Sequence, residues 1–333
     1  MLLDPLQSRL VLRAALENRF AVLAVNADSP AAITDVLEAA LACDAPVMIE
    51  ASLWQLTGLS FGAGDPALGM ARYLVDLALM ASAGRYRNLP ILFHTDHIRG
   101  PGALPLLTAS VRGLSTGVDG SVVSPSTVSV DSSQLSESEN VEALVAIAAA
   151  AAGAGRSVTL EMEAGVDDGV TDLETAARLL RGVEERAPDV VHLWAPGVGT
   201  RHGLGDQSAF SAEAVARHRD HAGRILGRPV GIALHGSSGL SPESLRRAVE
   251  SGVVKVNWSS ESLRIRSIAA RDFYALAGAT LESPGHVDWK STAMDQGVQA
   301  YVSDQYRPRV VERIRFLGSA GRGDVCRAVL SKS

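Results

Sequence analysis

The chain is short of several kinds of residue, and each shortage argues against a class of protein. Only two of its 333 residues are cysteines, Cys43 and Cys326, and they stand in no CxxC or C-x-H spacing. This argues against a disulfide framework or a cysteine-ligated zinc site, and we expect two buried thiols in a reducing compartment. No arginine-rich run interleaves with aromatic residues. Nucleic acid is therefore a poor candidate for a partner.

Long apolar runs are also missing. The longest, "ALVAIAAAAAGAG" at 143–155, is shorter than the about 20 residues that a membrane span needs, and its alanines favour a helix. The first twenty residues carry Asp4, Pro5 and Glu17 and lack the basic and apolar regions of a signal peptide. Together with a net charge of -6, this leads us to expect a cytoplasmic protein without a membrane partner.

What the chain does have is eight short, largely apolar runs, most of them separated by longer stretches of helical character. They lie at 20–27, 46–52, 90–97, 127–133, 157–164, 189–197, 229–236 and 253–260. Eight strand–helix units over about 240 residues are typical of an α/β fold, the closed (β/α)₈ TIM barrel. A doubly wound open sheet is the alternative, but it favours GxGxxG after the first strand, where this chain has "VNADSPA".

We expect one domain over 1–333, with the barrel at about 18–262 and a C-terminal helical extension at 263–333 that is long enough to cap the barrel or to dimerise. Ser29 and Thr171 are the predicted N-caps of two helices. The connection at 98–126 breaks the regular rhythm, and we expect a helix near 103–113 and loop in the rest.

Polar residues follow the apolar part of every predicted strand. In a barrel these strand ends converge on one mouth, where active sites lie. One polar strand end means little, but eight of them predict a site. The residues are Asn26, Glu50, Ser52, His94, Asp96, His97, Asp131, Ser132, Glu161, Glu163, His202, His235 and Asn257.

Three histidines are the predicted metal ligands, because His97, His202 and His235 close three different strands. A catalytic zinc site often has three protein ligands and one open position. Strand alternation gives His94 the parity of Asp96 and His97 the opposite one, so His94 is expected to be a supporting residue. We expect His192 to be structural. The remaining histidines, His218, His221 and His286, are expected to be solvated.

Asp96 adjoins a predicted ligand. It either orients a histidine or carries a proton to and from a substrate oxygen, and we favour the proton role. Two turns rich in glycine and serine, "HGSSG" (235–239) and "NWSSES" (257–262), follow the seventh and eighth strands. Barrel enzymes frequently bind phosphate after these two strands, so the turns predict a phosphate site.

Taken together, these pieces give the chain a family resemblance. "AVNADSPAAITDVLEAA", "APVMIEAS", "LPILFHTDH", "VSVDSSQLSESEN", "VTLEMEAG", "GTRHGLG", "IALHGSSGLSPESLRRAVESGVVKVNWSSES" and "FLGSAGR" follow one another along nearly the whole chain. In this order they resemble the class II, zinc-dependent fructose- and tagatose-bisphosphate aldolases.

The resemblance implies a lyase with zinc on His97, His202 and His235, and a monovalent cation as a further activator. Asp96 would be the acid/base and Asn257 would hold the enediolate, while Glu163 and Asp131 match positions that bind the metal in an alternative place. A homodimer or homotetramer acting on a phosphorylated small molecule is implied too. The implied substrate and phosphate residues are Gly203, Gly236, Ser238, Ser259, Ser260, Asn26 and Ser52.

The chain also departs from the family pattern. The loop "EAGVDDGVTD" is shorter than usual, and Asp167 or Asp168 would take the role of its proton-moving glutamate. "HGLGDQ" has Asp206 where the family often has a lysine. These differences favour a dihydroxyacetone-phosphate-type donor with an aldehyde of specialised metabolism. The alternatives are a fructose- or tagatose-bisphosphate aldolase of central carbohydrate metabolism, a different zinc-dependent barrel enzyme such as a hydrolase, and a non-catalytic barrel partner subunit.

Overall fold

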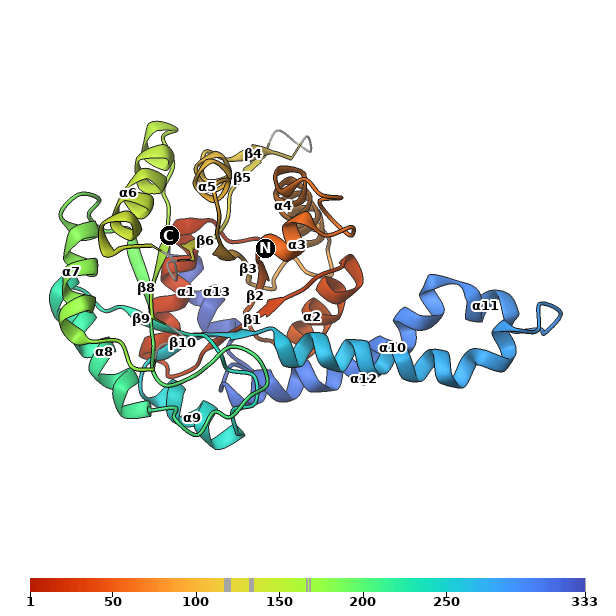
Figure 1. The fold of residues 1–333 in the computed structure, drawn as a ribbon. Coiled ribbons are helices and arrows are strands. Elements are labelled where there is room, and N and C mark those ends of the chain that lie inside the picture. Colours follow the sequence, from red (N-terminus) through yellow and green to blue (C-terminus); the bar gives the residue numbers. More distant parts are fainter. Residues whose placement is uncertain (117–120, 132–134, 166, 168, 333) are drawn as a thin grey trace.

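A closed barrel of eight parallel strands forms the body of the protein (Figure 1). The structure, a computed structural model, describes residues 1–116, 121–131, 135–165, 167 and 169–332. Around the barrel the strands follow the order β1-β10-β9-β8-β7-β6-β3-β2. The predicted (β/α)₈ barrel is therefore confirmed. The strands are β1 Val22–Asn26, β2 Val47–Ala51, β3 Ile91–Ile98, β6 Thr127–Val130, β7 Leu160–Ala164, β8 Val191–Pro196, β9 Gly231–Leu234 and β10 Val253–Trp258.

Helices between the strands surround the barrel (Figure 1). Ser29 caps its helix as predicted, accepting a hydrogen bond from the Ala32 N–H. The predicted cap Thr171 is wrong, because Asp172 caps that helix and the Thr171 hydroxyl instead donates to the Ala164 carbonyl. The helices are α2 Pro30–Ala42, α3 Leu53–Thr57, α4 Pro66–Ser82, α5 Ala103–Val111, α6 Glu137–Gly153, α7 Leu173–Glu184, α8 Ala212–Leu226 and α9 Pro242–Glu250.

The connection at 98–126 contains more regular structure than predicted. Helix α5 lies where a helix was expected. Beyond it, β4 (Leu114–Ser115) and β5 (Val122–Val123) pair antiparallel in a separate small sheet, where we expected loop.

Helix α1 (Pro5–Glu17) packs against β9 and β10, and α13 (Gly323–Leu330) packs against α1. Val11 and Phe20 share one buried apolar cluster with Met48 and Leu92 of the barrel strands. Two residues further along each strand, the chain places Glu50 and His94, both fully buried. Side chains two apart in a strand share a face, so polar groups replace apolar ones toward the carboxyl ends of these strands.

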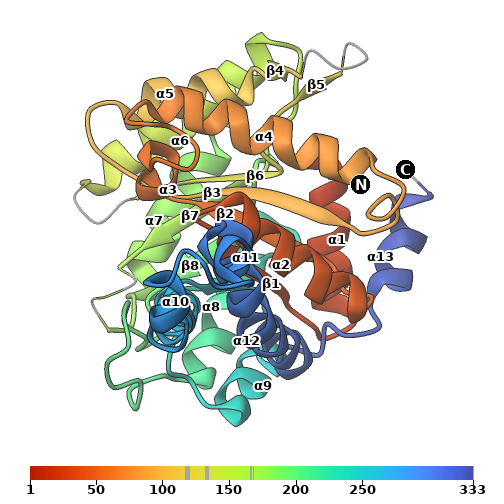
Figure 2. The ribbon, with the colours of Figure 1, turned by 90° about the vertical axis from the view of Figure 1, so that its right-hand side faces the viewer.

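The last long helices leave the barrel as an arm (Figure 1). It consists of α10 (Ser260–Leu281), α11 (Trp289–Ala293) and α12 (Asp295–Phe316), and α10 and α12 pack side by side (Figure 2). Among the described residues, no helix is both long and apolar enough to cross a membrane.

Candidate active site

The end of β3 brings two neighbouring side chains to the same place. His97 has a positive φ of 49°, and the pairing of β3 with β6 shifts register between Thr95 and Ile98. A regular strand would turn Asp96 and His97 to opposite sides, but both line the same cavity. Such backbone costs about 1–3 kcal/mol for a non-glycine residue and is concentrated at functional sites.

The three predicted ligand histidines meet above this strand end. His97 Nε2 lies 3.1 Å from His202 Nε2 and 2.7 Å from His235 Nδ1. His202 is exposed and His235 is 2% exposed, so the cluster lies between the solvent and the barrel interior. One nitrogen of each ring therefore points at a common centre.

The other nitrogen of each ring faces a carboxylate. His97 Nδ1 lies 3.0 Å from Glu163, His202 Nδ1 lies 2.9 Å from Asp167, and His235 Nε2 lies 2.8 Å from Glu161. Carboxylates in this position fix the tautomer and direction of a metal-binding imidazole. Three imidazoles so arranged fit a divalent ion such as zinc.

The pKa values of His235 and His97 are shifted in opposite directions. Burial, together with the charges of His97 and Lys255, holds the pKa of His235 well below its usual value, so this ring is neutral, as a ligand must be. Burial acts in the same direction on His97, but Glu163 and Asp96 outweigh it and raise the pKa of that ring well above its ordinary value.

Two amides hold the Asp96 carboxylate. Asn26 Nδ2 donates to Oδ2 and Asn257 Nδ2 donates to Oδ1, both at 2.9 Å. Burial would raise the pKa of Asp96, but His97, His235 and the hydrogen bond from Asn26 together lower it to about 2. Asp96 is therefore a fixed, ionised carboxylate that can accept a proton.

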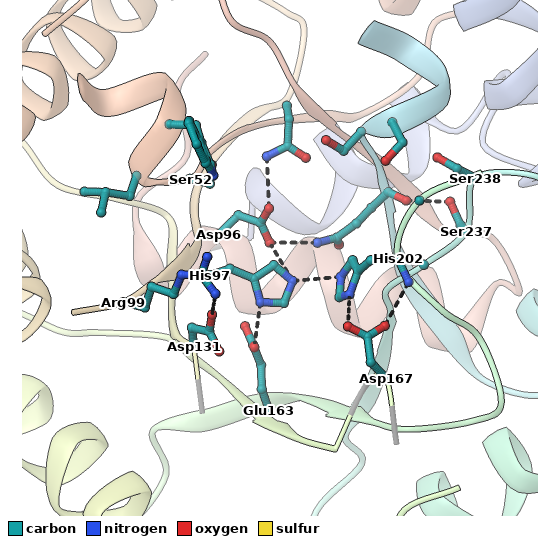
Figure 3. Close-up of a pocket in the computed structure, with 18 of the residues that line it drawn as sticks. Ser52, Asp96, His97, Arg99, Asp131, Glu163, Asp167, His202, Ser237 and Ser238 are labelled. Atoms are coloured by element: carbon teal, nitrogen blue, oxygen red, sulfur yellow. Dashed lines mark hydrogen bonds and ion pairs between the residues drawn. The ribbon is translucent and has the colours of Figure 1, made fainter. Parts of the chain in front are cut away.

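A cavity of about 710 Å³ opens over these groups (Figure 3). The predicted ligand His235 lies behind its wall, and Asp168 is outside the described residues. All the other residues predicted to have a catalytic, metal or substrate role line it: Asn26, Ser52, Asp96, His97, Asp131, Glu163, Asp167, His202, Gly203, Gly236, Ser238, Asn257, Ser259 and Ser260. The strand-end residues Glu50, His94 and Glu161 do not line it and are fully buried, and Ser132 is outside the described residues.

Of the two carboxylates predicted to offer an alternative metal position, one belongs to a candidate metal group among the described residues. Glu163 shares a group of close ligand atoms with Glu161 and His235. Asp131 belongs to none of the candidate metal groups found among the described residues, and its carboxylate lies 3.8 Å from Arg99.

Sequence reasoning missed a buried charge network beneath the cavity. The Lys255 ammonium lies 2.9 Å from both Glu50 and Glu161, and all three side chains are fully buried. Burial raises the pKa of Glu50 to about 8, although Lys255 opposes this shift. The only signal was a single lysine inside the apolar run "VVKVN".

Two of the three histidines predicted to be solvated are not. His218 is 1% exposed and lies between Trp194 Nε1 and the Thr171 carbonyl, so its prediction was wrong. His221 is half-buried, whereas His286 is exposed as expected.

Comparison with known proteins defines the class. The family described as "Fructose-bisphosphate aldolase class-II" matches residues 7–322. The chain belongs to this family and is an enzyme of its carbon–carbon lyase type. Fructose-bisphosphate aldolases of Neurospora crassa and Streptococcus pneumoniae are similar to it. The first is 25% identical over 78% of both chains, and the second is 27% identical over 93% of this chain and 96% of its own.

Solved structures share the fold. The fructose-bisphosphate aldolase of Campylobacter jejuni superposes with a TM-score of 0.79 at 19% identity, covering 96% of this chain and 95% of its own. The YdjI aldolase of Escherichia coli K12 gives a TM-score of 0.69 at 20% identity, covering 97% and 100%. At these identities the superpositions establish the barrel and its C-terminal helices, and say nothing of the substrate.

Proposed function

We propose that the protein is a zinc-dependent aldolase that joins or cleaves a dihydroxyacetone-phosphate-type donor and an aldehyde. The observation that carries this proposal is the convergence of three imidazole nitrogens beside a carboxylate that two amides hold in place. His97, His202 and His235 would hold the metal. When bound there, zinc would supply Lewis-acid stabilisation of the charge that develops on the oxygens of the donor.

The side chains around the metal site have separate tasks in this proposal. In the cleavage direction Asp96 takes the proton from the hydroxyl on the carbon whose bond to the donor carbon breaks. In synthesis it returns that proton. Asn257 fixes Asp96 and holds the donor's enediolate from the β10 side. Asp167 contacts the His202 ring and backbone N–H and lines the cavity. In this proposal it orients His202 and moves the proton that leaves or returns to the donor's hydroxymethyl carbon.

The donor phosphate would bind at the turns after β9 and β10. Gly236 has a φ of 64°, and a Cβ there would stand 2.6 Å from the Arg201 carbonyl oxygen, so the turn requires glycine. Ser238, Ser259 and Ser260 of these turns also line the cavity. The first turn of α10 begins there, and the N-terminus of a helix favours an anion.

The part of the cavity where we place the acceptor aldehyde is lined by Arg99 and by residues of α3, and this lining favours an aldehyde other than that of central sugar metabolism. Among the described residues lining the cavity, Arg99 is the one arginine or lysine. It belongs to the connection at 98–126 and lies on the other side of His97 from Ser237 and Ser238 (Figure 3). Leu53, Trp54 and Thr57 of α3 also line the cavity. An acceptor would therefore meet one cation and an apolar rim.

Product formation tests this proposal directly. The zinc-loaded protein is incubated with dihydroxyacetone phosphate and a panel of aldehydes, and adducts are read by mass spectrometry. The donor alone in deuterated water should exchange a proton at its hydroxymethyl carbon. If the kcat/KM for cleavage of fructose or tagatose bisphosphate exceeds the kcat/KM for formation of any new adduct, the central-metabolism alternative is favoured. The absence of both exchange and adducts would favour a non-catalytic barrel.

Metal content gives a second prediction. We expect about one zinc per chain by elemental analysis, since three histidines make one site. His202→Ala removes an exposed ligand and should lose both zinc and turnover, whereas His286→Ala, an exposed histidine of the arm, should keep both. Full zinc content in His202→Ala would remove this residue from the ligand set.

Self-association through the arm is a further part of the proposal. Leu276 is 73% exposed, Val287 is 90% exposed and Met294 is 50% exposed, although all three are apolar. We expect Leu276→Asp with Val287→Asp to lower the mass measured by light scattering to that of one chain. An unchanged mass, with wild type an oligomer, would place the interface elsewhere.

A further inference from the structure

One arginine of the arm reaches behind the phosphate turn. Arg313, near the end of α12, is only 6% exposed. Its Nη2 donates to the Ser237 carbonyl oxygen at 2.6 Å and lies 3.1 Å from the Ser237 hydroxyl. The guanidinium also lies over the Trp258 ring, 5.6 Å from its centroid, and 3.5 Å from the Glu261 carboxylate.

This contact links the two turns that flank the donor side of the cavity. The Ser237 hydroxyl donates to the Asn257 carbonyl, and the Glu261 N–H donates to the Ser238 hydroxyl at 3.1 Å. Trp258 Nε1 donates to the Glu261 carboxylate at 2.8 Å. Arg313 contacts Ser237, Trp258 and Glu261, and it therefore joins the two turns through side chains of both.

The contact of Arg313 with the Ser237 carbonyl also sets the direction of the Ser238 N–H, because both groups belong to one peptide. In a trans peptide the C=O and the following N–H point in opposite directions. Arg313 and the Leu240 N–H both bind the Ser237 carbonyl, so the Ser238 N–H points away from them. Ser238 lines the cavity and Arg313 does not. That N–H donates to no residue that the structure describes.

We propose that Arg313 is a positioning residue for the donor phosphate: it fixes the Ser237 carbonyl so that the Ser238 N–H is presented to the anion. The inference rests on the proposed function, because it assigns the anion to the donor. The ion pair with Glu261 offsets much of the arginine charge, so the effect is chiefly geometric. The guanidinium needs its fork of donors for this task, and a lysine cannot reproduce that fork.

The test compares two donors that differ only in the phosphate. For Arg313→Met we expect the KM of dihydroxyacetone phosphate to rise about tenfold, the effect of losing an oriented hydrogen bond to an anion. The kcat with this donor, and the slow turnover of unphosphorylated dihydroxyacetone, should change little. Arg313→Lys should recover only part of the KM. Arg309→Ala, on the same helix and paired with Glu312 at the surface, should behave as wild type.

A binding measurement separates this inference from the proposed function. Inorganic phosphate is titrated by calorimetry into zinc-loaded wild type and both Arg313 variants, with zinc content and melting temperature as checks of folding. Weaker phosphate binding in the variants supports the inference even if wild type forms no adduct, which would contradict only the proposed function. Equal phosphate affinity, or equal loss with both donors, would overturn the role of Arg313; if Arg313→Met does not fold, Arg313→Lys decides.

Discussion

Asp96→Ala is expected to lower turnover by about 10²-fold or more while the protein keeps its zinc. The carboxylate is buried, ionised and held by two amides, and it lies 3.7 Å from the nearer nitrogen of the His97 ring. In the proposed function it is the base for a substrate hydroxyl. The proton step should therefore fail, whereas the three imidazoles proposed to hold zinc are not altered.

The measurement pairs kcat with zinc content in the same preparation. Asp220→Ala, which removes an exposed carboxylate paired with Arg219, is the matched control and should keep full turnover. The buried amides of Asn26 and Asn257 lose their partner in Asp96→Ala, at a cost of about 1–3 kcal/mol in stability, so kcat is compared below the melting temperature of the variant. If zinc and turnover are lost in proportion, Asp96 orients the metal ligand instead; full turnover would contradict the proton role.

Periodicity was sufficient to predict the barrel, because short, largely apolar runs recur along the chain and are mostly separated by longer helical stretches. It was not sufficient at the end of β3. Alternation separates Asp96 from His97, and only the register shift and the left-handed backbone of His97 bring them together. The motif "HTDH" does not predict the positive φ of His97, since a non-glycine residue adopts it only when the surrounding structure imposes it.

The groups behind the site were hardest to predict. Arg313 lies 76 residues beyond the Ser237 carbonyl that it holds, and a charged residue in the last turn of a helix is ordinarily solvated. Thr171 and Asp172 are both good caps, and only the contact of Thr171 with the Ala164 carbonyl decides between them. Such choices depend on tertiary contacts that a local pattern does not contain.

Lys255→Met is expected to lower the free energy of unfolding by about 3–5 kcal/mol, the usual cost of removing one partner from a buried ion pair. Lys255 lies between Glu50 and Glu161 and contacts both, and Glu161 in turn accepts the hydrogen bond of His235 Nε2. Without the ammonium, burial raises the pKa of Glu50 further above its present value of about 8. The folded variant then holds protons that the unfolded chain releases.

The sign of the pH dependence follows from that difference. When the folded pKa of a carboxyl lies above its unfolded pKa, the protein loses stability as pH rises between the two values. In the variant this interval of pH is wider than in wild type. The deficit measured by urea unfolding should therefore be larger at pH 8 than at pH 6. Lys290→Met, at an exposed lysine of α11, should show no deficit.

Adding Glu50→Gln to Lys255→Met removes one of the two unpaired carboxylates and should restore part of the stability at pH 8. A deficit that is the same at both pH values, or no recovery in the double variant, would mean that Lys255 acts through packing of its stem and not by neutralising the carboxylates beneath the metal site.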